Sequence, residues 1–76
     1  MTRRIAEIEL EIRQDWKNVQ YSALPYLNAM MVLGDINSSY GYDSAREIVT
    51  RFLCNASTWR GENARRIKKE LKDMLK

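Results

Sequence analysis

The chain has 76 residues, of which 45% are hydrophobic and 30% are charged, with a formal net charge of +3. This balance is typical of one small folded domain and too apolar for a disordered chain. No apolar run approaches the roughly 18 residues of a membrane-spanning helix, and the N-terminal region lacks the apolar core of a signal peptide, so we expect one cytoplasmic domain over residues 1–76.

The residue types that catalysis and metal binding need are scarce. The sequence contains no histidine, and Cys54 is its single cysteine. A metal site would need carboxylates and one thiol, which do not cluster along the chain. Nucleophilic catalysis needs a base beside the nucleophile, most often histidine. We therefore predict a protein that is not an enzyme and that has no catalytic, metal-binding or cofactor-binding residues.

Residues 3–19 are predicted to form an amphipathic helix. Its apolar side chains recur at spacings of three and four residues within an arc of roughly 80°; they are Ile5, Ile8, Ile12, Trp16 and Val19. Leu10 projects roughly 160° from the centre of that stripe, so we expect it to be exposed. It is either an isolated surface leucine or a contact with a protein partner.

Residues 23–33 are predicted to form a short second helix, with Pro25 in its first turn, where the missing N–H costs little. Asn28 is the only polar residue in the apolar run that follows. A helix that is hydrophobic on every face is normally buried. We therefore expect this helix at the centre of the fold, with Met30 and Met31 in the core.

Residues 34–43 are rich in Gly, Asn, Asp and Ser and are predicted to form a loop. Its tyrosines indicate that it folds back on the helices, and we take Tyr40 and Tyr42, together with Leu10, as a possible protein interface. Asp43 suits the N-cap of a third helix near residues 44–58.

The third helix is expected to bury one apolar face, consisting of Ala45, Ile48, Val49, Phe52, Leu53 and Ala56 and extended by Trp59. Cys54 falls roughly opposite this face. No neighbouring cation or helix N-terminus is evident that would make it a reactive thiol.

Most of the excess positive charge lies in the last helix, predicted near residues 62–75 after a break at Gly61. Residues 60–76 contain seven basic and three acidic side chains, whereas the rest of the chain has a net charge of −1. The buried stripe of this helix is expected to contain Ala64, Ile67, Leu71, Met74 and Leu75. Beside it, cations occupy an arc of roughly 100°. With Arg60 they form what we call the basic strip: Arg60, Arg65, Lys68, Lys69, Lys72 and Lys76.

Two interpretations of the basic strip stay open. Like-charge pairs one turn apart cost roughly 0.2–0.5 kcal/mol each, and cations near a helix C-terminus gain a similar amount, so a solvated face needs no binding role. Alternatively, the strip contacts phosphates or an acidic protein surface. The last two helices also fit a helix-turn-helix loosely, in which Asn63, Arg65 and Arg66 would read base edges.

Three stretches, YGYDSAREIV, FLCNASTWRGENAR and IKKELKDML, resemble small uncharacterised accessory proteins of Gram-positive prophages and integrative elements. The resembling residues lie in the C-terminal half and are Tyr40, Gly41, Asp43, Ser44, Ala45, Asn55, Ala56, Trp59, Arg60, Gly61, Ala64, Arg65, Ile67, Lys68, Glu70 and Leu71. The resemblance implies an accessory protein that acts by binding a component of the host or of the element. It carries over no catalytic residue.

The sequence as a whole predicts an all-α fold, a compact four-helix domain with a possible helix-turn-helix-like hairpin at its C-terminal end. The predicted function is that of a non-enzymatic accessory protein that binds a host or element protein, self-association included. The alternative is a nucleic-acid-binding regulatory protein that uses the basic C-terminal helix.

Overall fold

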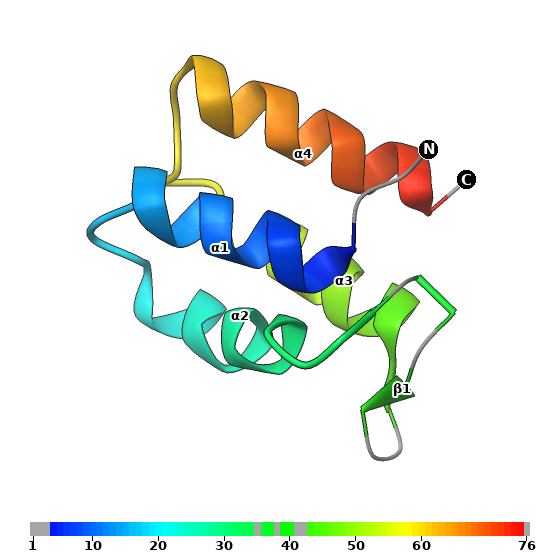
Figure 1. Ribbon diagram of the computed structural model, residues 1–76. Helices are drawn as coiled ribbons and strands as arrows, with labels where there is room; N and C mark the ends of the chain where they lie inside the picture. The colour runs from blue at the N-terminus through cyan, green and yellow to red at the C-terminus, as the bar shows by residue number, and fades with distance from the viewer. Residues whose placement is uncertain (1–3, 35, 38, 41–42, 76) are drawn as a thin grey trace.

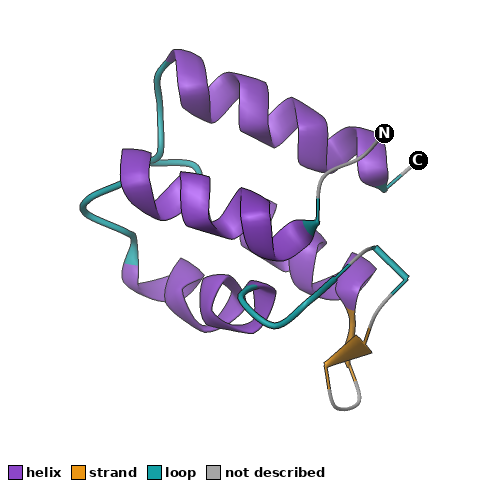
Figure 2. Cartoon of the chain, viewed as in Figure 1, coloured by secondary structure: helices purple, strands orange, loops and turns teal. Residues whose placement is uncertain are grey.

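The computed structural model describes residues 4–34, 36–37, 39–40 and 43–75 (Figure 1). Its helices are α1 (Ile5–Asp15), a short 3₁₀ helix η1 (Tyr21–Ala23), α2 (Leu24–Met30), α3 (Ala45–Cys54) and α4 (Glu62–Met74). Within the predicted loop, β1 (Ser39–Tyr40) and β2 (Asp43–Ser44) pair as a small antiparallel hairpin (Figure 2). The all-α, four-helix fold predicted from the sequence is confirmed, since this hairpin has only two residues in each strand.

Helix α1 lies between α2 and α4, and α3 packs chiefly against α2 (Figure 1). The backbone N–H groups of Ile5 and Ala6 donate to the carbonyl oxygens of Gly34 and Leu33, at 2.9 and 3.1 Å. The first turn of α1 has no side-chain cap, so these carbonyls satisfy donors that would otherwise be unpaired. They also fix the start of α1 beside the segment that follows α2.

Every helix contributes side chains to one apolar core. The predicted stripes of α1, α3 and α4 are buried, except that Val19, Leu53 and Leu75 are only partly buried. Phe52 is completely buried, and its ring meets Trp16 edge-on with 6.3 Å between centroids. Trp16 in turn stacks on Trp59 at 5.6 Å, so the prediction that Trp59 belongs to the core is confirmed.

Several predicted helix ends are wrong. Helix α1 ends at Asp15 rather than residue 19, because Trp16 adopts an extended backbone that turns its indole toward Trp59. Helix α3 ends at Cys54 rather than at residue 58. Its N-cap is Ser44 and not Asp43: the Ser44 hydroxyl accepts a bond from the Glu47 N–H at 3.2 Å, the pattern of a helix N-cap.

The prediction that the second helix is central and buried on every face is also wrong. Helix α2 lies at the edge of the bundle and buries only one side, including Leu27 and Met30. Met31 and Val32, in the turn that follows, are 53% and 68% exposed. A four-helix domain of this size has too little volume to surround one of its own helices.

Candidate functional site: the basic strip of α4

Four cations of the basic strip are exposed on α4 and on the linker that precedes it: Arg60, Arg65, Lys69 and Lys72. Within the described part of the chain, the ion pairs are Arg13–Glu9, Arg51–Glu47 and Arg66–Glu11, so none involves these four residues. Lys76 lies outside the described residues. These four cations are therefore exposed and take part in none of the ion pairs of the described structure.

The strip begins where the chain reverses into α4. Gly61 has φ 119°, a backbone conformation that favours glycine over residues with a Cβ. Its carbonyl accepts the Arg65 N–H at 3.0 Å and so starts the helix. This turn places Arg60 and Arg65 on either side of the helix start.

Lys68 differs from the other cations because the fold uses it internally. Its Nζ donates to the Trp59 carbonyl oxygen at 2.7 Å and lies 5.8 Å from the centroid of the Trp59 ring. The side chain is half-buried, and this burial lowers the pKa of Lys68, with further lowering by Lys72 and Arg60. Lys68 therefore ties the linker to α4 while adding to the positive potential of the strip.

A concavity of about 270 Å³ opens at this turn and is lined by Trp59, Arg60, Gly61, Ala64, Arg65 and Lys68. Its charged lining residues are all cations, and part of its floor is apolar. One anionic group, such as a carboxylate or a phosphate, matches this lining in charge.

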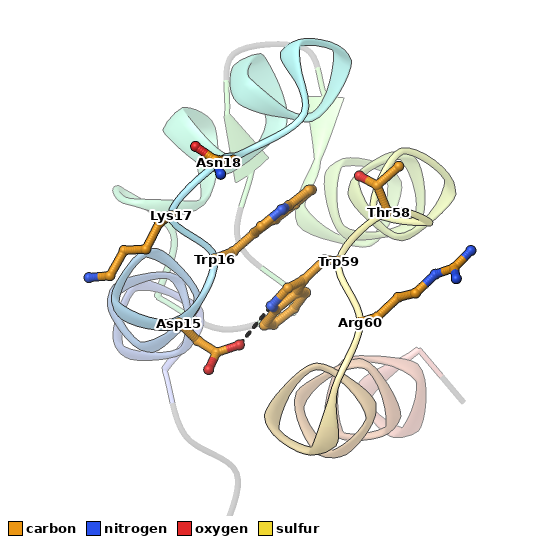
Figure 3. Close-up of a pocket in the computed structure, with 7 residues that line it drawn as sticks. All are labelled: Asp15, Trp16, Lys17, Asn18, Thr58, Trp59 and Arg60. Atoms are coloured by element: carbon orange, nitrogen blue, oxygen red, sulfur yellow. Dashed lines mark hydrogen bonds between the residues drawn. The ribbon is translucent and has the colours of Figure 1, made fainter.

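A second concavity, of about 520 Å³, lies between the end of α1 and the linker (Figure 3). Asp15 accepts hydrogen bonds there from Trp59 Nε1 at 2.8 Å and from Asn63 Nδ2 at 3.0 Å. These bonds, that of Asn63 first, lower the pKa of Asp15. The carboxylate thus holds the linker and α4 in place, while Arg60 extends away from it (Figure 3).

Two of the three residues predicted to read base edges are occupied by contacts within the fold. Asn63 is bound to Asp15, and the Arg66 guanidinium pairs with Glu11 of α1. Arg65 remains exposed. The connection between α3 and α4 spans residues 55–61, longer than the three- or four-residue turn of a helix-turn-helix.

The predicted protein interface is only partly within the described structure. Leu10 is 58% exposed, as predicted, whereas the side chain of Tyr40 and the whole of Tyr42 lie outside the described residues. Sequence reasoning missed a second exposed apolar group: Tyr21, Met31 and Val32. Met31 and Val32 belong to the apolar run of the predicted second helix, which we interpreted as burial.

Cys54, which the sequence places opposite the apolar face, is exposed. No three His, Cys, Asp or Glu side chains among the described residues are grouped so that they could hold a metal ion. No helix in the described ranges combines the length and the apolar character needed to cross a membrane.

Comparison of the chain with protein-family models, curated proteins and solved structures finds no match. A functional assignment therefore rests on the residues of this chain and their geometry.

Proposed function

We propose that this chain is a non-enzymatic binding protein whose basic strip docks on an acidic surface of a partner protein. The observation that carries the proposal is the row of four exposed cations that form no ion pair in the described structure: Arg60, Arg65, Lys69 and Lys72. Unpaired cations on one face attract an anionic partner and orient it as it approaches. The resemblance to accessory proteins of mobile elements agrees with a binding role.

The arrangement favours a protein partner over sequence-specific recognition of DNA. Trp59 is 2% exposed, so its ring cannot stack on a base. Asn63 and Arg66 are held by α1. Acidic side chains also border the strip, since Glu62 and Asp73 project next to Lys69 on the helix. Such a mixed edge suits a protein surface with charges of both signs better than a uniformly anionic duplex.

The network around Trp59 holds the strip in a fixed geometry before any partner arrives. Trp59 is bound through its indole N–H to Asp15 and through its carbonyl to Lys68, and it stacks on Trp16. A preformed surface loses less conformational entropy on binding than a flexible one. The linker cation Arg60 and the first-turn cation Arg65 are therefore presented without a folding step.

The test is capture of proteins from an extract of the cells that carry the gene. The variant Lys69→Gln/Lys72→Gln removes two charges from the strip, and Lys17→Gln/Arg51→Gln removes two exposed charges elsewhere. The wild type and the control should retain the same protein at about 50 mM salt, where the Debye length is longer than the roughly 10 Å found at 0.1 M and charges are less screened. The strip variant should lose that protein. Equal retention by all three proteins would contradict the proposal.

A second candidate function is binding of the nucleic-acid backbone, which the same four cations favour. Four phosphate contacts would make the affinity for a generic duplex fall with salt at a log–log slope of about −3.6. The strip variant should reduce that slope by about 1.8. Duplex binding with these slopes, in the absence of any captured protein, would replace the acidic protein with nucleic acid as the partner.

A further inference from the structure

The outer side of η1 and α2 has an exposed surface without charged residues. Tyr21 is 88% exposed, Val32 68% and Met31 53%, and Pro25 and Asn28 are also exposed. Pro25 and Asn28 lie on the exposed side of α2, Tyr21 lies in η1 before it, and Val32 lies in the turn that follows it. A group of exposed apolar side chains on a small protein is a candidate interaction site.

Leu10 extends this surface onto α1. It lies three residues before Arg13, whose guanidinium donates to Asn28 Oδ1 at 2.6 Å and approaches the Met31 sulfur at 3.6 Å. Residues three apart on a helix are neighbours, so Leu10 borders the same contact. We call the group the uncharged face, and its members are Leu10, Tyr21, Pro25, Asn28, Met31 and Val32.

Arg13, the cation at the edge of the uncharged face, is already neutralised. Its guanidinium pairs with Glu9, whose side chain is 5% exposed. Residues 18–34 contain no Asp, Glu, Lys or Arg, although 30% of the chain is charged. The six members of the face therefore carry no charge, although the exposed carboxylate of Glu7 lies three residues before Leu10 at its border.

We propose that two copies of this chain associate through the uncharged face. In a symmetric dimer the same patch faces itself, so each charge on an interface would approach a like charge of the second copy. A face with no charge avoids that repulsion, whereas the basic strip would enforce it. An interface with a different protein would not need to be free of charge, and selective recognition of that protein would be expected to use charge pairs.

The basic strips do not oppose this association. Helix α1 lies between α2 and α4 (Figure 1), so the width of one helix, about 10 Å, separates the strip from the dimer face within each copy. The Debye length at 0.15 M salt is about 8 Å. Repulsion between the two strips is therefore largely screened, and both strips stay accessible at opposite ends of the dimer.

Sedimentation equilibrium over a concentration series tests the proposal. The wild type should pass from the 9.0 kDa monomer to twice that mass, and rising salt should leave the association unchanged or strengthen it. Val32→Lys and Tyr21→Lys should each weaken dimerisation about tenfold or more, because every substitution buries two like charges. Thr50→Lys, which adds the same charge to an exposed position of α3 opposite its buried side, should dimerise like the wild type.

Two results would overturn the proposal. The first is a wild type that stays monomeric up to about millimolar concentration, the range of the weakest specific associations. The second is a dimer that Val32→Lys and Tyr21→Lys leave intact, which would place the interface on another surface. A Lys69→Gln/Lys72→Gln protein that dimerises normally but loses its acidic partner would show that dimerisation and partner binding use different surfaces.

Discussion

The two exposed faces on opposite sides of α1 differ in the physics that any partner would have to use. Four exposed cations of the basic strip form no ion pair in the described structure, whereas the uncharged face exposes apolar side chains and one amide. Attraction to the strip is long-ranged and weakens with salt. Association through the uncharged face removes apolar area from water, which salt does not screen. The fold thus places a charged surface and an apolar surface on opposite sides of α1 (Figure 1).

The largest effect is expected in the core that holds both faces in position. Phe52→Ala removes a fully buried ring that contacts Trp16 and should lower the free energy of unfolding by roughly 3–5 kcal/mol. That is close to the whole stability of a small domain. Urea denaturation followed by tryptophan fluorescence measures the change. A loss below about 1 kcal/mol, typical of surface sites, would show that the ring does not anchor the bundle.

Salt should act in opposite directions on the two faces. Between 50 and 200 mM salt, the affinity of the strip for an anionic partner should fall by about tenfold or more, because the added salt screens several charge contacts. Dimerisation through the uncharged face should hold or tighten over the same range. Partner-binding titrations and sedimentation equilibrium on one preparation check this. If salt weakened both interactions in parallel, the two faces would not differ in the forces that they use.

Within the strip, Lys68 should behave differently from its neighbour Lys72. Lys68→Met removes the hydrogen bond to the Trp59 carbonyl and should cost about 1 kcal/mol of stability. Lys72→Met changes an exposed side chain and should stay within about 0.5 kcal/mol. Thermal unfolding of the two variants makes the comparison. Equal stabilities would mean that the Lys68 contact contributes nothing to the linker.

Acid should loosen the linker through Asp15. Its hydrogen bonds to Asn63 and Trp59 lower its pKa in the folded state, so the unfolded chain binds this proton more readily. The stabilisation is present above the unfolded pKa of about 3.9 and is lost as pH falls through the lower folded value. The effect should be smaller than that of Lys68→Met, since Asp15 is exposed. Asp15→Asn should flatten this part of the pH–stability profile, and an unchanged profile would assign the acid sensitivity to other carboxylates.

The smallest effect is expected at Cys54. The thiol is exposed on the side of α3 away from the core, so Cys54→Ser should change stability by less than about 0.5 kcal/mol. Binding by both faces should also be retained if the protein acts by binding alone. Loss of binding in a folded Cys54→Ser protein would indicate that the thiol takes part in the chemistry.

The sequence by itself determined the four helices, the all-α class and most of the core, because helix periodicity is a local property that each segment carries alone. It also determined that Leu10 is exposed and that Cys54 lies opposite the apolar face of its helix, since both lie off an apolar stripe. The stop at Trp16 was not predictable in this way, because it depends on Trp59, which is distant in the chain and adjacent in space.

Only the tertiary structure decided which apolar and charged residues stay available to partners. The uncharged run that contains Met31 and Val32 has the pattern of a buried helix, yet α2 lies at the edge of the bundle and exposes them. Asn63, Arg66 and Lys68 look as free in the sequence as Arg65, but contacts with α1 and the linker engage them. The periodicity of one helix indicates which of its sides is apolar. Which sides meet a neighbour depends on how all four helices share a core too small to cover every apolar residue.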